Sequence, residues 1–383
     1  VHCGLRRKQQ RDLGLIACDV PAVAAAVYTT NVFQAAPLKV MQDSLQVEGK
    51  MQAIVVNSKN ANACTGEQGE RDARQMQRET AQLLGIPVHY VGVASTGVIG
   101  ERMPMDKISH GIKQLKPEKT KTGSDLFSQA ILTTDTRTKN VQVTLQINGK
   151  TVQIAGAAKG SGMIKPNMAT MLAFMTTDAA IAPASLQQLL RETTDSTYNM
   201  IAVDGDMSTN DMVAVMASGL AGNDELDVTH PQWNDFVAAF HYVHEQLAQA
   251  IARDGEGATR LIEVRVKGAA TARMAKQAAK SVIGSNLVKT AVFGADGNWG
   301  RIICAVGYSD VSVNPDNVDI AIGDIPVVRH SLPVAFDEQQ VSEAMKQDPV
   351  VIDVDLHQGD ETATAWGCDL TYDYVRINAS YRT

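Results

Sequence analysis

Aromatic residues are scarce in this sequence of 383 residues, where Phe, Trp and Tyr together account for 5% of the chain. Apolar residues of all kinds reach 44%, so a large core is available, but it must be built mainly from aliphatic side chains and methionine. No apolar run approaches the ~20 residues that a transmembrane helix needs. The length is sufficient for two domains of ordinary size.

The chain also lacks a long basic run, and its net charge is −7. Nucleic acid and anionic membrane surfaces are therefore not expected as partners. The five cysteines are far apart and form no Cys-x-x-Cys pair, which argues against a disulfide framework or a zinc knuckle and is typical of a reducing cytosol. The chain opens at Val1 without an initiator Met and without the apolar core of a signal peptide. We therefore expect a cytoplasmic protein, and the missing Met leaves open whether the native start has been removed.

Strand and helix patterns are mixed along the whole chain without a strict strand–helix–strand rhythm, which predicts a layered α/β protein. The clearest strand signal is an alternating hairpin over 141–156 around the turn sequence Asn148-Gly149. The clearest helix signal covers 231–253, where apolar residues recur every three or four positions. Further strands are predicted at 13–18, 24–28, 51–57, 88–94, 170–177, 260–268, 363–370 and 372–377. Further helices are predicted at 67–84, 105–115, 124–131, from 183 onwards, at 270–283 and at 337–346.

The most informative stretch is 157–178, in which Gly160 and Gly162 free the backbone before an apolar run begins. A small residue and a hydroxyl, Ala169-Thr170, lie at the junction. A Thr hydroxyl is a poor nucleophile unless a base lies beside it, and cutting the chain before the Thr turns its own α-amine into that base. An α-amine titrates near ~7.7–8.0, against ~10.4 for Lys, so a useful share is uncharged at neutral pH. The alternative interpretation is that Thr170 simply opens a buried strand.

A second loop suits the stabilisation of a developing negative charge. Ser95-Thr96-Gly97 follows a predicted buried strand and offers a hydroxyl together with a backbone N–H, which are the donors that an oxyanion hole requires. An ordinary turn is the alternative interpretation of this Thr-Gly pair.

Three other patterns fail when their spacing is compared with what the chemistry needs. The acidic run 204–215 has Thr209 where a calcium loop requires Gly and Val215 where it requires Glu. The histidines and glutamate of 241–245 have no matching third ligand, so no metal site is predicted. The pyrophosphate-like pattern 153–158 is followed by glycines instead of a helix N-terminus. We therefore expect no metal and no resident cofactor.

Many short motifs, distributed over nearly the whole chain, are informative as an ordered set. They are 29–31 (Thr-Thr-Asn), 57–66, 95–100, 133–136 (Thr-Thr-Asp-Thr), 159–164, 169–170, 204–211, 254–259, 298–301 and 378–383. In this order they resemble one family, the ornithine acetyltransferases, which are glutamate N-acetyltransferases of arginine biosynthesis. The departures are the apparently shortened beginning and Gly297, where the family pattern has Pro.

The resemblance implies a self-cleaving precursor of the N-terminal-nucleophile kind, cut immediately before Thr170. The α chain would be 1–169 and the β chain 170–383. The implied fold is a four-layer αββα sandwich with a smaller C-terminal lobe. Residues 170–258 would complete the sandwich, and 259–383 would form the smaller lobe and C-terminal strands. The implied assembly is a heterotetramer of two α and two β chains.

The implied activity is transfer of an acetyl group from N2-acetyl-L-ornithine to L-glutamate, by a ping-pong route through acetyl-Thr170. The small-molecule partners would therefore be N-acetylornithine, glutamate and ornithine. Thr96 and Gly97 would form the oxyanion hole. The implied substrate-binding residues are Thr133, Lys159, Thr170, Glu256, Asn378 and Thr383. Lys159 suits the α-carboxylate that both substrates carry, and Glu256 suits a cationic amine.

Three alternatives stay open on the residues alone. Acetyl-CoA is a further candidate donor, because family members with and without that activity share these motifs. A self-processed aminopeptidase or amidase would use the same nucleophile and pass its acyl group to water. A non-catalytic small-molecule binding protein would keep the chain uncut.

Overall fold

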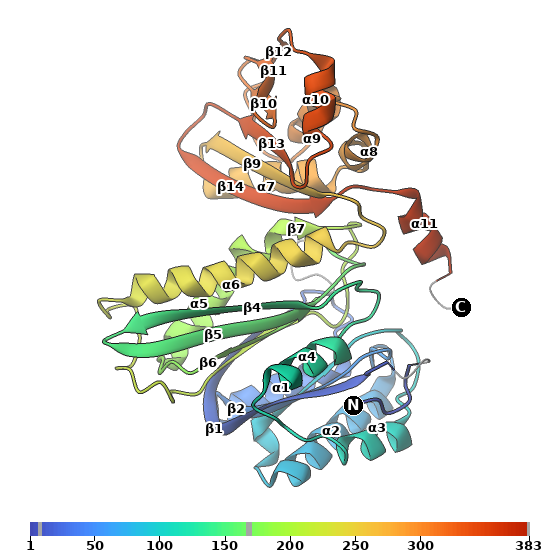
Figure 1. Ribbon diagram of the computed structural model, residues 1–383, viewed down its shortest axis with the longest axis vertical. Helices are drawn as coiled ribbons and strands as arrows, with labels where there is room; N and C mark the ends of the chain where they lie inside the picture. Colours follow the sequence, from blue (N-terminus) through green and yellow to red (C-terminus); the bar gives the residue numbers. More distant parts are fainter. Residues whose placement is uncertain (7–9, 166–170, 381–383) are drawn as a thin grey trace. The chain divides into compact units, whose positions relative to one another are not determined.

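The computed structural model describes residues 1–6, 10–165 and 171–380 (Figure 1). The chain forms two compact units, each with its own seven-stranded sheet. Unit 1 consists of Val1–Gly160, Asn167–Asp195 and Met207–Leu247, and unit 2 consists of Ser161–Pro166, Ser196–Asp206 and Ala248–Thr383. The mixed α/β class predicted from the sequence is confirmed.

The sheet of unit 1 has the strand order β3-β2-β1-β8-β6-β5-β4. Its strands are β1 (Leu13–Tyr28), β2 (Lys50–Asn57), β3 (Val91–Ser95), β4 (Lys139–Ile147), β5 (Lys150–Lys159), β6 (Leu172–Thr177) and β8 (Met212–Ala217). Strands β2 and β3 are parallel, as are β6 and β8, whereas the other neighbouring pairs are antiparallel. Figure 1 shows β4, β5 and β6 as neighbouring ribbons in this sheet.

The turn between β4 and β5 follows directly from its two residues. Asn148 and Gly149 have φ values of 47° and 72°, the left-handed conformation that a two-residue hairpin requires and that these residue types tolerate best. The predicted hairpin is confirmed, with its register running from Lys139 opposite Ala158 to Ile147 opposite Lys150.

The first strand differs from the prediction of two separate strands. β1 continues through the expected turn, and a register shift between Ala17 and Ala22 relative to β2 accommodates the extra residues. A bulge of this kind bends a strand without ending it, so Pro21 does not interrupt β1.

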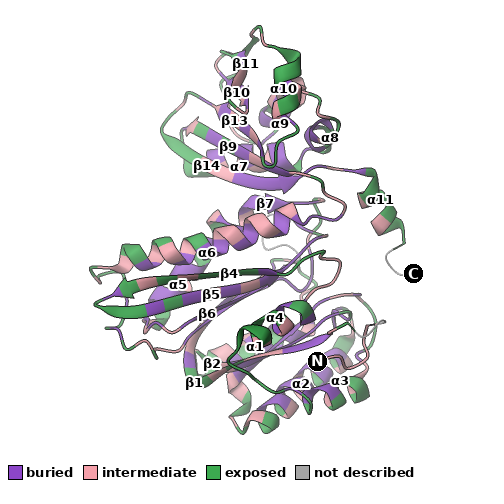
Figure 2. Cartoon of the chain, viewed as in Figure 1, coloured by how far each residue is buried: buried purple, intermediate pink, exposed green. Residues whose placement is uncertain are grey.

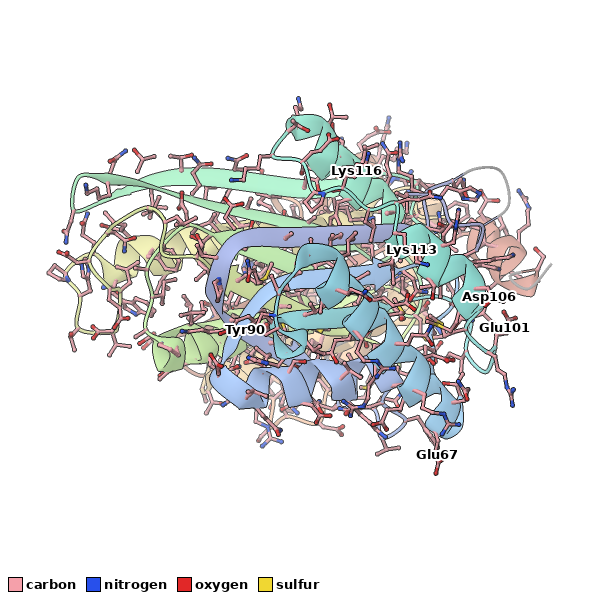
Figure 3. All side chains as sticks on the ribbon, turned by 90° about the horizontal axis from the view of Figure 1, so that it is seen from below. Glu67, Tyr90, Glu101, Asp106, Lys113 and Lys116 are labelled. Carbon is pink, nitrogen blue, oxygen red and sulfur yellow. The ribbon has the colours of Figure 1, made fainter. Side chains whose placement is uncertain are left out.

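Each helix of unit 1 has one face of buried residues and one face that is more exposed (Figure 2). These helices are α1 (Ala36–Glu48), α2 (Gly66–Leu84), α3 (Met105–Ile112), α4 (Lys121–Ala130), α5 (Pro183–Ser196) and α6 (Trp233–Arg253), the last two passing at their ends into unit 2. In α2, Ala73, Met76 and Ala81 are buried, as their helical spacing predicts. Figure 3 shows Glu67 and Asp106 on α2 and α3 pointing outwards, where their charges stay hydrated. The core thus lies between the helices and the sheet.

The sheet of unit 2 has the order β12-β11-β10-β13-β9-β14-β7. Its strands are β7 (Ile201–Ala202), β9 (Leu261–Ala269), β10 (Asp319–Ile322), β11 (Ile325–Arg329), β12 (Leu332–Pro333), β13 (Val350–Asp355) and β14 (Glu361–Cys368). Its helices are α7 (Ala272–Gly284), α8 (Asn286–Gly294), α9 (Trp299–Gly307), α10 (Glu338–Ala344) and α11 (Tyr372–Ala379), and short 3-10 turns occur at η1 (Val88–Tyr90) in unit 1 and η2 (Tyr198–Met200) in unit 2.

One predicted strand near the C-terminus is wrong. Residues 372–377 form most of helix α11, and no residue of that helix is buried. A helix without a buried side has no apolar periodicity of 3.6 residues in its sequence, so no helix signal was present at 372–377. The neighbouring prediction, a strand at 363–370, agrees with β14.

Within residues 1–6, 10–165 and 171–380, no helix is both long enough and apolar enough to cross a membrane.

Candidate active site

The loops that follow β2 and β3 lie side by side in unit 1 because the two strands are parallel neighbours, with Asn57 opposite Ser95. The Ser95 hydroxyl donates to the Asn57 side-chain oxygen at 2.6 Å, and the Thr96 N–H donates to the Asn57 carbonyl at 3.0 Å. Asn210 clamps both loops by donating to the carbonyls of Ala61 at 2.6 Å and of Ser95 at 2.8 Å. The polar side chains of this segment therefore hold the backbone of the 95–97 loop in place.

Gly97 occupies a position that no other residue fits. Its φ is 137°, and an added Cβ would lie 2.1 Å from the backbone carbonyl carbon of Lys59. In the part of the chain that the structure describes, the Gly97 N–H donates no hydrogen bond. A buried hydroxyl on Thr96 next to an uncommitted N–H on Gly97 is the donor pair that an oxyanion hole needs.

Lys159, the last residue of β5, extends into this region. Its ammonium donates to the Thr96 hydroxyl oxygen at 3.4 Å, although the residue is only 2% exposed. Burial lowers the pKa of the Lys159 ammonium, and the Asp135 carboxylate partly opposes that effect. On the neighbouring strand, Lys159 is paired with Leu172, the second residue after Thr170. This pairing brings Lys159 to the chain segment that begins the predicted β chain.

Asp135 organises the segment that contains Thr133. One carboxylate oxygen accepts from the Lys139 ammonium and from the Gly160 N–H, both at 2.7 Å, and the other accepts from the Thr133 N–H at 3.0 Å. The side chains of Asp135 and Lys139 are fully buried. Burial alone would raise the pKa of the Asp135 carboxyl, but Lys159 and Lys139 hold it well below its usual value. The carboxylate is thus fully ionised at neutral pH.

Asp211, immediately before β8, carries a second buried carboxyl. Its Oδ1 accepts from the Met171 N–H at 2.9 Å, whereas its Oδ2 has no hydrogen-bond partner among the described residues. The nearby hydroxyl of Thr29 donates instead to the Ser208 carbonyl at 2.9 Å. Burial raises the pKa of Asp211 well above its usual value, so the group is neutral over a wider pH range than an ordinary aspartate.

Unit 2 contains a separate group of predicted site residues. Glu256 is 7% exposed and its carboxylate accepts from the Asn378 side-chain amide at 2.8 Å. The Glu256 N–H donates to the Ser161 carbonyl at 3.0 Å, and a Cβ on Gly162 would lie 2.4 Å from the Glu256 carboxylate. Gly162 is therefore needed for the close approach of the loop to this carboxylate.

The predicted site residues thus fall into two groups that the two units assemble independently. Unit 1 brings Thr96, Gly97, Lys159 and Thr133 together, and unit 2 joins Glu256 to Asn378. Ala169, Thr170 and Thr383 lie outside the described residues. Within the described ranges, no group of three or more His, Cys, Asp or Glu side chains is arranged to hold a metal ion.

Three charged residues of the site escaped the sequence analysis. Asp135 and Asp211 lie in the motifs 133–136 and 204–211, where they received no role. Lys139 had a readable signal, because the alternation of the hairpin places it on the same side of β4 as Val141 and the other apolar residues. A lysine on the apolar side of a strand indicates a buried, paired charge.

Comparison with known proteins identifies the family. The ArgJ family model matches residues 1–383. The chain belongs to the ArgJ family. Among curated ArgJ relatives, the arginine biosynthesis bifunctional protein ArgJ of Geobacillus kaustophilus is 62% identical over 100% of this chain and 93% of its own length. That of Geobacillus stearothermophilus is 60% identical over the same shares.

A solved ArgJ structure, the arginine biosynthesis bifunctional protein of Bacillus halodurans, is 56% identical with a TM-score of 0.53. It covers 54% of this chain and 97% of its own. The predicted family and the fold class of the ornithine acetyltransferase type are confirmed. As an ArgJ protein, the chain is an acyltransferase of arginine biosynthesis.

Proposed function

We propose that this protein transfers the acetyl group of N2-acetyl-L-ornithine to L-glutamate through an acetyl ester of Thr170. The observation that carries the residue assignment is the position of the Lys159 ammonium beside the Thr96 hydroxyl, at 3.4 Å. This arrangement places a cation for the substrate α-carboxylate next to the donors for the reacting carbonyl. Both substrates are α-amino acids or their derivatives, so one cation serves both halves of the reaction.

In the first half-reaction the Thr170 hydroxyl attacks the acetyl carbonyl, and its proton passes to the Thr170 α-amine. The Thr96 hydroxyl and the Gly97 N–H stabilise the resulting oxyanion. The C–N bond then breaks, the proton returns to the departing amine, and ornithine leaves behind an acetyl ester. In the second half-reaction the glutamate amine attacks this ester and gives one proton to the Thr170 α-amine, which passes it to the departing Thr170 oxygen as the ester C–O bond breaks.

Self-cleavage before Thr170 is part of this proposal because it supplies the α-amine. The length of the solved Bacillus halodurans chain supports it, since 97% of that chain corresponds to only 54% of the present one. A relative divided into two polypeptides would contain chains of this length. We further propose that the α and β chains pair as a heterotetramer in the cytoplasm.

The assay that tests the function supplies glutamate with acetylornithine or acetyl-CoA in separate reactions and identifies the products by mass spectrometry. We expect N-acetylglutamate and ornithine from the first reaction, and the second shows whether acetyl-CoA is also a donor. Acetate in place of N-acetylglutamate would contradict acetyl transfer and favour an amidase. The Thr170→Ala variant should stay uncut and inactive, whereas cleavage of this variant at the same bond would point to a host protease.

A further inference from the structure

Among the described residues, more buried ammonium groups than ionised carboxylates lie around Lys159. Lys139 and Lys159 are each 2% exposed, and both lie close to the carboxylate of Asp135. One carboxylate thus faces two ammonium groups. The carboxyl of Asp211 also faces Lys159, but burial raises its pKa and so disfavours the charged form that would compensate the ammonium.

The carboxylate is committed to only one of the two lysines. Lys139 forms an ion pair with Asp135 at 2.7 Å, between two side chains that are completely buried. Lys159 forms no ion pair with any described residue, and its one hydrogen bond there goes to the neutral hydroxyl of Thr96. The Asp135 carboxylate is therefore the ion-pair partner of Lys139 and not of Lys159.

The backbone fixes this choice of partner. Lys139 is four residues from Asp135 and opens β4, opposite Ala158 on β5. The Gly160 N–H and the Thr133 N–H hold the carboxylate from two further sides. A carboxylate with this many donors keeps its orientation, so it does not turn towards Lys159 while Lys139 is present.

We propose that Lys139 is a positioning residue for the transfer reaction, because it occupies the Asp135 carboxylate and so keeps the Lys159 ammonium available for the α-carboxylate of the substrate. This inference rests on the proposed function of Lys159. Without Lys139, a buried Asp135 carboxylate without an ion pair would be costly, and Lys159 is a nearby cation that can neutralise it. An internal ion pair would then compete with the substrate.

The first test compares KM values of the cleaved enzyme. Lys139→Gln should raise KM for both acetylornithine and glutamate about 10- to 100-fold, the value of one charge-assisted hydrogen bond. Removing both partners, with Asp135→Asn and Lys139→Gln together, should bring KM back towards the parent value because Lys159 is free again. Lys150→Gln removes an exposed lysine from the same hairpin and serves as the matched control without effect.

A merely structural role predicts the opposite order. If the Asp135–Lys139 pair only held the loop together, the double variant would bind substrate as poorly as Lys139→Gln or more poorly. That result would overturn the inference, and so would an unchanged KM in Lys139→Gln.

A second measurement uses stability and is independent of substrate. Lys159→Gln should leave the melting temperature of the parent unchanged or raise it, because it removes an unpaired buried charge. In the Lys139→Gln background the same change should lower the melting temperature, because Lys159 is then the counter-ion of Asp135. Equal effects in the two backgrounds would overturn the inference. A third outcome is that the effect of Lys159→Gln on the melting temperature differs between the two backgrounds while KM is unchanged by Lys159→Gln. In that case Lys159 does pair with Asp135 when Lys139 is absent, but it does not bind the substrate carboxylate.

Discussion

The Asp211 carboxyl accepts a hydrogen bond from the Met171 N–H at 2.9 Å, and Met171 is the residue that follows Thr170. The second oxygen of Asp211 has no hydrogen-bond partner among the described residues. A buried carboxyl, whose pKa burial raises, is therefore hydrogen-bonded to the residue that follows the proposed cleavage site.

The first prediction concerns this carboxyl. Asp211→Asn keeps the shape and the acceptor for Met171 but removes the acidic proton, so the fragment that begins at Thr170 should form about 10²-fold more slowly. Intact-mass measurements over time after synthesis would follow the reaction. Asp72→Asn, a change at another buried aspartate, in helix α2, is the control. Processing of Asp211→Asn at the parental rate would show that the proton comes from elsewhere.

The second prediction concerns the oxyanion hole. Thr96→Ala should lower kcat for acetyl transfer about 10²–10³-fold, because one principal donor to the developing negative charge is lost. Thr96→Ser retains the hydroxyl and should keep most of the rate. Circular dichroism should be unchanged in both variants, since each change removes at most two heavy atoms from one loop side chain. A kcat of Thr96→Ala within about threefold of the parent would remove this residue from the site.

The third prediction concerns pH. Burial lowers the pKa of Lys159, while Asp135 opposes the change, and Lys139 and Arg6 lie near enough to contribute to the lowering. The ammonium is the form that binds a carboxylate. KM for both substrates should therefore rise as the pH increases through this lowered pKa, at a pH below the ~10.4 of an ordinary lysine. KM measured from pH 6 to 10 checks this, with Lys159→Gln as the variant that lacks the transition.

The fourth prediction concerns the C-terminal helix. The Asn378 amide donates to Glu256 at 2.8 Å and to the Tyr374 carbonyl at 3.0 Å, so it joins α11 to a carboxylate proposed to bind substrate. Asn378→Ala should raise KM for acetylornithine about tenfold, the value of one hydrogen bond to a charged group. The melting temperature should change little, because no residue of α11 is buried. Equal KM values for Asn378→Ala and the parent would exclude this role.

Local patterns predicted much of the fold because each carried its own physical signal. Asn148-Gly149 specified a turn, and alternation around it specified two paired strands. The Thr96-Gly97 loop was readable as a candidate oxyanion hole because a hydroxyl and a glycine follow a buried strand. The helix at 372–377 could not be predicted from its sequence, since an exposed helix has no buried face that would require apolar residues at regular spacing.

The ion pairs and hydrogen bonds among the charged residues of the site could not be predicted from local sequence patterns. Strand alternation predicts that Lys139 is buried. That its partner is Asp135 depends on how the 135–138 loop folds and on the N–H of Gly160, the residue after β5. Asp211 has no local signal of its environment, because its burial comes from strands that are distant in sequence. Such relationships require the tertiary structure.

The strand order of unit 1 determines what a cut before Thr170 does to the molecule. β8 lies between β1 and β6, and β6 lies between β8 and β5, so strands from the C-terminal fragment are inserted between strands from the N-terminal fragment. Separating the fragments would break two ladders, β1 with β8 and β5 with β6. A chain cut at this bond would thus consist of two peptides that share one sheet without a covalent link between them. It should migrate as two bands under denaturing conditions yet behave as one inseparable body in its native state, and the two halves would have to fold together if they were made from separate genes.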